Sequence, residues 1–133
     1  MNLVPVIAFS TSIITTSAAA LPPLRDVPEI DDSMLWVALA VEISDRCETI
    51  EPRTFRGLTY LWQLKSRAAE LGYSDADIEA YADSRTEKER IRNRGEAYVR
   101  ARGLNPEIDR DLCKLGRREI KKGSQIGALL KAK

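Results

Sequence analysis

The 133-residue sequence contains no histidine and only two cysteines. Histidine is the most frequent general base and a common metal ligand, so its absence removes the simplest catalytic and metal-binding arrangements. The Ser-x-x-Lys, Gly-x-Ser-x-Gly and His-Glu-x-x-His motifs and glycine-rich phosphate loops are also missing. We therefore expect no cofactor and no metal ion, and we favour a protein that is not an enzyme.

Signals for β-structure are missing as well. No segment shows sustained alternation of apolar and polar residues, and no Asn-Gly or Asp-Gly turn occurs. Apolar residues make up 44% and charged residues 31% of the chain, which is typical of a globular protein. The sequence predicts an all-α fold, a small bundle of about five helices in a single domain over residues 31–133.

The first 20 residues carry no charged side chain. Residues 3–16 are mostly apolar, and the three alanines at 18–20 match the small-x-small pattern of a signal peptidase site. We interpret residues 1–20 as a cleaved signal peptide and Leu21 as the mature start, which predicts a periplasmic or secreted protein. A retained membrane anchor is the alternative, although a span needs about 20 predominantly apolar residues.

Helix boundaries follow from capping residues, prolines and glycines. Residues 21–30 contain three prolines and predict an extended leader. Ser74 with Asp77, and Ser84 with Glu87, fit the capping-box spacing at helix starts. The helices are predicted at 34–43, 52–71, 75–82, 85–102 and 106–122, with glycines 72, 103 and 123 after three of them. In the second helix we assign the buried stripe to Phe55, Leu58, Leu61, Trp62, Ala68, Ala69 and Leu71.

The two cysteines are Cys47 and Cys113. In an exported chain two cysteines usually pair, because the periplasm and the extracellular space are oxidising. We therefore predict one structural disulfide between the first and fifth helices, with free thiols as the alternative. A redox-active pair is disfavoured because there is no Cys-x-x-Cys motif.

Charge is divided along the chain. Residues 21–84 contain six Lys/Arg and thirteen Asp/Glu, or −7, whereas residues 85–133 contain fifteen and seven, or +8. Three interpretations remain open: solvated helix faces that attract each other within the fold, a docking surface for an acidic protein or an anionic membrane face, and nucleic-acid binding. The last is disfavoured because the basic helices contain few aromatic residues.

Two acidic patterns suggest sites. Residues 75–83 resemble a calcium loop, but Ala80 and Thr86 stand where an EF-hand requires glycine and glutamate. Glu42 lies inside an apolar run, where burial would raise its pKa and suit an acid catalyst in an interhelical cleft. The simpler interpretation pairs Glu42 with Arg46 on the outer edge of the helix. Trp36 and Trp62 could line such a cleft, although tryptophans at helical spacing more often belong to a core.

Four segments carry a family resemblance: LPPLRDVPEIDDSMLWVALAVEI, AAELGYSDADIEAYADS, DLCKLGRREI and GSQIGALLKAK. Together they resemble a family of small exported alphaproteobacterial proteins that is catalogued as a domain of unknown function. The resemblance covers nearly all of the mature chain. It implies an exported helical domain with two paired cysteines, and it implies no active-site residue.

The function that we favour is a non-catalytic interaction or accessory protein. Its basic C-terminal helices would dock on an acidic protein partner or an anionic membrane surface. The expected docking residues are Arg90, Arg94, Arg117, Arg118, Lys121 and Lys122. The alternatives are a small-ligand binder or enzyme with an interhelical cleft around Glu42, and a domain that self-associates through its opposite charges.

Overall fold

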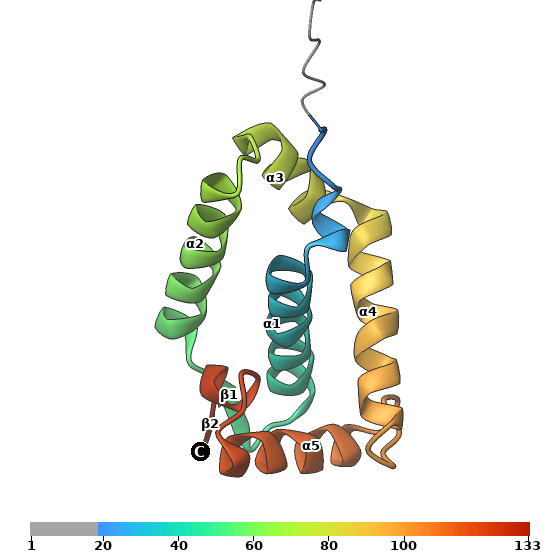
Figure 1. The fold of residues 1–133 in the computed structure, drawn as a ribbon. Helices are drawn as coiled ribbons and strands as arrows, with labels where there is room; N and C mark the ends of the chain where they lie inside the picture. The colour runs from blue at the N-terminus through green and yellow to red at the C-terminus, as the bar shows by residue number, and fades with distance from the viewer. Residues whose placement is uncertain (1–18) are drawn as a thin grey trace, which may run out of the picture.

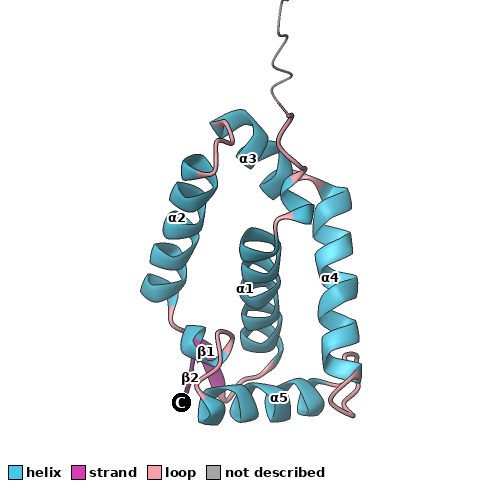
Figure 2. Ribbon diagram, viewed as in Figure 1, coloured by secondary structure: helices cyan, strands magenta, loops and turns pink. Residues whose placement is uncertain are grey.

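A computed structural model describes residues 19–133. Residues 19–133 form an all-α fold with five helices, as predicted, and the remaining regular structure of this region consists of two 3-10 turns and a two-stranded ribbon (Figures 1 and 2). The predicted signal peptide lies almost wholly outside the described residues. The elements in chain order are η1 (Leu24–Asp26), α1 (Pro28–Arg46), β1 (Ile50–Pro52), α2 (Thr54–Glu70), α3 (Asp75–Asp83), α4 (Arg85–Arg100), α5 (Asp109–Lys122), η2 (Gly127–Leu129) and β2 (Leu130–Ala132).

Helix α1 stands at the centre of the molecule (Figure 1). Helices α2 and α4 flank it, α3 joins their far ends, and α5 crosses below the C-terminal end of α1 (Figure 1). The principal packing partners of α1 are α4 and α5, whereas α2 contacts it less extensively. This central position explains why the middle of α1 is so uniformly apolar in sequence.

The start of α1 differs from the prediction. The helix begins at Pro28, where the fixed φ of proline suits a first helical position, and not after Asp31–Ser33. The expected extended leader is also partly folded, since residues 24–26 form the turn η1. Leu24 and Ile30 are buried in a small second cluster, so this segment packs against the domain.

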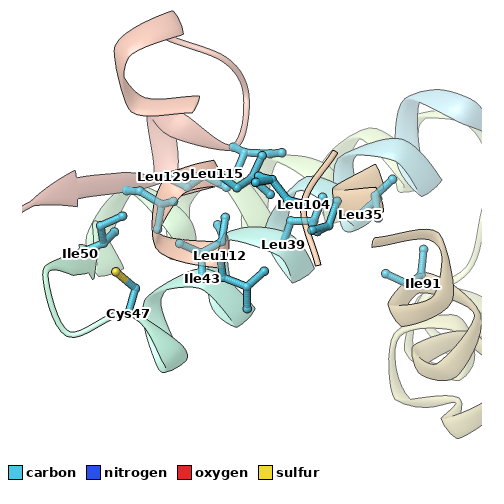
Figure 3. Packing of buried hydrophobic residues seen from close by; sticks show 14 residues of the cluster. Leu35, Leu39, Ile43, Cys47, Ile50, Ile91, Leu104, Leu112, Leu115 and Leu129 are labelled. Carbon is cyan, nitrogen blue, oxygen red and sulfur yellow. The ribbon is translucent and has the colours of Figure 1, made fainter. Parts of the chain in front are cut away.

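The main core joins α1 to α5 (Figure 3). Ile43 on α1 and Leu115 on α5 are both 0% exposed. Burying one large aliphatic side chain stabilises a fold by roughly 1.5–3 kcal/mol, so this interface anchors the domain. Other members of the core include Leu35, Leu39, Ile50, Ile91, Val99, Leu104, Leu112, Ile126, Leu129 and Leu130.

The predicted disulfide joins Cys47, which follows α1, to Cys113 on α5. Cys47 is 1% exposed and lies beside Ile50 in the core (Figure 3). Both cysteines of the sequence are used, which leaves no free thiol. The covalent link therefore reinforces the same α1–α5 contact that the core forms.

The ribbon of β1 and β2 was not predicted. It is antiparallel and places Ile50 opposite Ala132 and Pro52 opposite Leu130. Each strand has only three residues, which is too short for an alternating pattern to be visible in sequence. Ile50 and Leu130 are both buried, so the ribbon closes the core at the end where α1 stops.

Several predicted helix ends are confirmed. Ser74 and Asp77 form the capping box of α3, and the Ser84 hydroxyl accepts a hydrogen bond from the Glu87 amide at the start of α4. Gly123 ends α5 in the left-handed conformation, with φ of 66°. Helix α5, however, begins at Asp109 and not at the predicted Asn105-Pro106.

Gly127 provides a sharp test of the tail's packing. A methyl group at this position would overlap the backbone carbonyl of Glu119 and lie 2.7 Å from the Ile120 nitrogen. Backbone atoms cannot move aside as a flexible side chain can, so Gly127→Ala should destabilise the fold by at least about 2 kcal/mol. Urea denaturation would measure this, with Gly57→Ala as control because its surroundings are open. Equal effects of both substitutions would contradict this account of the tail.

Candidate functional site

Helix α2 exposes the residues that were predicted to be buried. Phe55 is 88% exposed, Trp62 is 71% exposed and Leu58 is 62% exposed, whereas Ala68 is the one fully buried residue of the helix. The predicted stripe is therefore wrong for most of its members. Large exposed aromatic residues are unusual enough on a small domain to require an explanation.

The reason for the error is that α2 carries two apolar stripes. The inner one includes Tyr60, Leu64 and Ala68, which pack against the two core clusters. The outer one follows the i, i+3, i+7 spacing of Phe55, Leu58 and Trp62. Both stripes have helical periodicity, and a helix at the edge of a domain can turn only one of them inward. We call the outer set, Phe55, Leu58, Leu61 and Trp62, the α2 face.

The charges of α2 are positive up to its last residue, Glu70, which pairs with Arg67 at 3.2 Å. Residues 53–69 contain two arginines before the middle of the helix, then Lys65 and Arg67, and no acidic residue. Arg53 and Arg56 donate hydrogen bonds to the carbonyl oxygens of Leu130 and Ala128, which hold them without neutralising them. The α2 face is thus apolar and bordered by positive charge.

Arg67 and Lys65 have acidic neighbours. Arg67 pairs with Glu29 at 2.8 Å, and Lys65 lies 3.9 Å from Asp75. Both pairs are exposed, where ion pairs contribute little to stability and are screened by salt. These two pairs reduce the net positive charge beside the α2 face only near the C-terminal end of α2.

The six predicted docking residues fall into two groups. Arg117, Arg118, Lys121 and Lys122 are exposed on α5, and none pairs with an acidic residue within residues 19–133. Arg90 and Arg94 are different, because both pair with Asp31 inside the fold. For these two arginines, the interpretation that acidic and basic parts of the chain attract each other within the fold is therefore sufficient.

Asp31 is the centre of this buried ion cluster. It is 3% exposed, its Oδ2 accepts a hydrogen bond from Arg90 at 3.0 Å, and its Oδ1 accepts one from the Tyr81 hydroxyl at 2.6 Å. Burial raises the pKa of Asp31. The hydrogen bonds from Arg90 and Tyr81 and the charge of Arg94 have a larger, opposite effect, so the pKa of Asp31 lies below the ordinary value of an aspartate. The cluster links the start of α1 to α3 and α4 and serves the fold.

Glu42 lies beside a groove between α1 and α4 that has a volume of about 600 Å³. The predicted pair is confirmed, since Arg46 donates a hydrogen bond to Glu42 at 2.9 Å. Arg46 also binds Asp109 and the carbonyl oxygens of Pro106 and Glu107. The groove coincides with the predicted interhelical cleft, and the Glu42 carboxylate that lines it is paired with Arg46.

A second polar cluster lies between α4 and α5. The Tyr98 hydroxyl donates a hydrogen bond to Glu119 at 2.9 Å, and the guanidinium of Arg102 stacks 3.2 Å from the Tyr98 ring centre. Burial and the hydrogen bond to Glu119 raise the pKa of Tyr98 to about 12. Trp36 packs edge-on against Tyr98, as expected for a tryptophan of the core, whereas Trp62 lies in the solvent.

The described part of the chain offers neither a metal-binding cluster nor a membrane-spanning helix. Residues 19–133 contain no group of three or more acidic or cysteine side chains placed to hold a metal ion. Asp77, from the calcium-like segment, caps α3 instead. Among the helices of this region, none combines the length and apolar character needed to cross a bilayer.

Comparison with known protein families gives a match. A family model matches residues 22–131, which is nearly all of the described chain. No curated protein and no solved structure matches the sequence or the fold.

Proposed function

The chain belongs to DUF5333, a family of unknown function, and we propose that it is an exported, non-catalytic accessory protein that attaches to an anionic membrane face through α2. The observation that carries this proposal is the exposure of Phe55 and Trp62 on one side of a helix that has no acidic residue over positions 53–69. A basic helix with aromatic residues on its apolar side is the usual form of an interfacial membrane anchor.

Burial of the α2 face provides the driving force. Transfer of one fully exposed large apolar side chain out of water contributes about 2 kcal/mol. Phe55 and Trp62 also have the ring shape that favours the boundary between headgroups and acyl chains. Because these side chains are exposed in the free protein, little packing has to be broken before they insert.

Electrostatics favours an anionic membrane. Lys and Arg residues near an anionic surface each contribute about 1 kcal/mol to attraction. Turn η2 contacts both α2 and α5, and the C-terminal end of α5 lies toward the same end of the molecule as the start of α2 (Figure 1). Lys121 and Lys122 are the last residues of α5, and Phe55 belongs to the first turn of α2. The proposed docking surface therefore includes residues of both α5 and α2. It does not include Arg90 and Arg94, which pair with Asp31.

Export is supported by the disulfide. A structural disulfide persists in oxidising compartments such as the periplasm and is rare in the reducing cytosol. The proposal places the mature protein on the outer side of the cytoplasmic membrane or beyond it, where Cys47 and Cys113 remain paired.

The proposal predicts the effect of removing two rings. The double variant Phe55→Ala/Trp62→Ala should bind phosphatidylglycerol-containing vesicles at least about tenfold more weakly, because both inserted side chains are lost. Vesicle co-sedimentation measures the partition coefficient. Ile108→Ala is the matched control, since Ile108 is an apolar residue exposed elsewhere. Addition of salt should weaken the binding of the unaltered protein.

Two outcomes would contradict membrane attachment. One is unaltered protein that fails to bind anionic vesicles at low salt. The other is a double variant that binds as well as the Ile108→Ala control. If light scattering instead finds dimers that the double variant abolishes, the α2 face joins two copies of the chain and the membrane proposal is wrong.

A further inference from the structure

We propose that the groove between α1 and α4 binds a single acyl chain that carries an anionic headgroup. The walls of the groove are aliphatic, with Met34, Val37, Ala38 and Val41 on α1 and Ile91 on α4. Val41 is 51% exposed at the lip, so the groove opens to solvent along α1. Ligand sites of this volume are typically apolar and have a few polar groups at fixed positions.

Gly95 sets the depth of the groove. It is buried on α4, and a Cβ atom at this position would lie 3.3 Å from the Leu39 side chain. The two helices therefore come close at this point, and the aliphatic side chain of Leu39 forms part of the floor. Leu39, Ile91 and Val99 give the buried part of the lining an aliphatic surface, which suits an alkyl chain.

The length of the groove suits an extended chain. The groove extends along α1 from Met34 to Arg46, which are 12 residues apart (46 − 34) and hence about 18 Å apart. Its volume of about 600 Å³ is spread along this length, as in an elongated groove. An extended chain can lie along such a groove with one side open to solvent.

The chemistry of the walls distinguishes between extended chains. An extended peptide brings an N–H and a C=O group with every residue, and each needs a partner when it is buried. The groove is bounded mainly by two helices, α1 and α4, whose backbone groups already bond within each helix. An acyl chain has no polar groups to satisfy and is the occupant that these walls accept.

The headgroup is assigned by the charges that have no partner. Lys88 and Arg92 are exposed on the α4 wall one helical turn apart, and neither forms an ion pair within residues 19–133. Glu42 is held by Arg46, and Glu96 by Arg100 at 2.9 Å. The unpaired acid on the wall, Glu107, follows α4 and lies at the opposite end of the groove.

The uncompensated charge at the α4 start is thus positive. An anionic headgroup beside Lys88 and Arg92 gains two favourable interactions and stays far from Glu107. A free fatty acid and a lysophospholipid share this chemistry. The groove is separate from the α2 face, because it lies between α1 and α4 and can be loaded without a membrane.

The test uses the full mature chain and two soluble probes, laurate and lysophosphatidylglycerol, each below its micelle concentration. Isothermal titration calorimetry should show one molecule bound per chain, and the tighter probe identifies the source of the acyl chain. Absence of binding by both probes would overturn the proposal. Since no vesicle is present, a failure here is distinct from a failure of membrane attachment.

Variants locate the bound chain. Ala38→Trp fills the groove and should weaken binding of both probes at least about tenfold. Ala97→Trp, on the exposed side of α4, should leave it unchanged. Val41→Glu serves if Ala38→Trp does not fold, because Val41 is half-exposed and its replacement places a charge on the lip. Binding that survives these groove substitutions would place the ligand elsewhere.

A charge reversal tests the headgroup. Lys88→Glu/Arg92→Glu should weaken laurate binding about tenfold and leave dodecanol, which has no charge, unaffected. Arg110→Glu/Lys114→Glu is the matched control, since it reverses two exposed cations with the same spacing on α5. Equal loss of laurate binding in both double variants would show that net charge is responsible and would overturn the assigned position of the headgroup.

Discussion

Replacement of both cysteines, as Cys47→Ala/Cys113→Ala, should lower the free energy of unfolding by about 4 kcal/mol. Cys47 and Cys113 are 66 positions apart, so the disulfide closes a loop of 65 intervening residues. The closed loop removes many conformations from the unfolded chain. The total free energy of unfolding of a domain of this size is about 5–15 kcal/mol, so the variant should be marginally stable. Urea denaturation at neutral pH measures the difference.

Reduction of the unaltered protein is the control for this prediction. It breaks the same link without changing the packing of Cys47, which is 1% exposed in the core. The reduced protein should therefore lose nearly as much stability as the double variant, and the small remainder reports the cavity left by the missing sulfur. A loss below about 1 kcal/mol in both cases would mean that the unfolded chain is already compact and that the link constrains little.

Substitution of the central carboxylate, Asp31→Asn, should cost about 3 kcal/mol. The amide leaves Arg90 and Arg94 next to one another without the negative charge that compensates both. The cost lies at the lower end of the range for broken buried pairs, because the two arginines remain partly exposed. Asp32→Asn is the control. Asp32 is half-exposed and pairs with Arg94 alone, so its loss should cost less than about 1 kcal/mol.

The same cluster predicts how stability depends on pH. The pKa of Asp31 is lower in the folded state than in the unfolded chain, so the unfolded state binds the proton more readily. The contribution of Asp31 is therefore complete above the unfolded value, about 4, and is lost as the pH falls through the folded value. Denaturation curves between pH 7 and pH 3 should fall more steeply for the unaltered protein than for Asp31→Asn. If stability falls equally with pH in both proteins, carboxylates other than Asp31 are responsible for the loss of stability in acid.

Local signals in the sequence predicted most of the helices. The capping residues Ser74 and Ser84 and the stop at Gly123 act through hydrogen bonds and backbone conformations within a few residues, so their effect is visible without the fold. The disulfide was predictable because two cysteines allow only one intramolecular pairing. The ribbon was not, since Ile50 and Ala132 become neighbours only after α5 has placed the tail.

The candidate surfaces were harder to predict for the same reason. Helical spacing identifies Phe55, Leu58 and Trp62 as one stripe but does not say which stripe of α2 turns inward. Likewise, the number of basic residues does not reveal that Arg90 and Arg94 meet Asp31, 59 and 63 positions away in the chain. One sequence signal for the α2 face was available, namely that residues 53–69 contain cations and no acids.

The pairing of β1 with β2 also sets the time at which the protein can finish folding. Ile50 lies opposite Ala132, which is made 82 positions later (132 − 50), and Cys113 must likewise wait for α5. During synthesis, or passage through an export channel in the N-to-C direction, α1 has no complete partner surface until the tail emerges. Such a chain can complete its core only after its tail has been released.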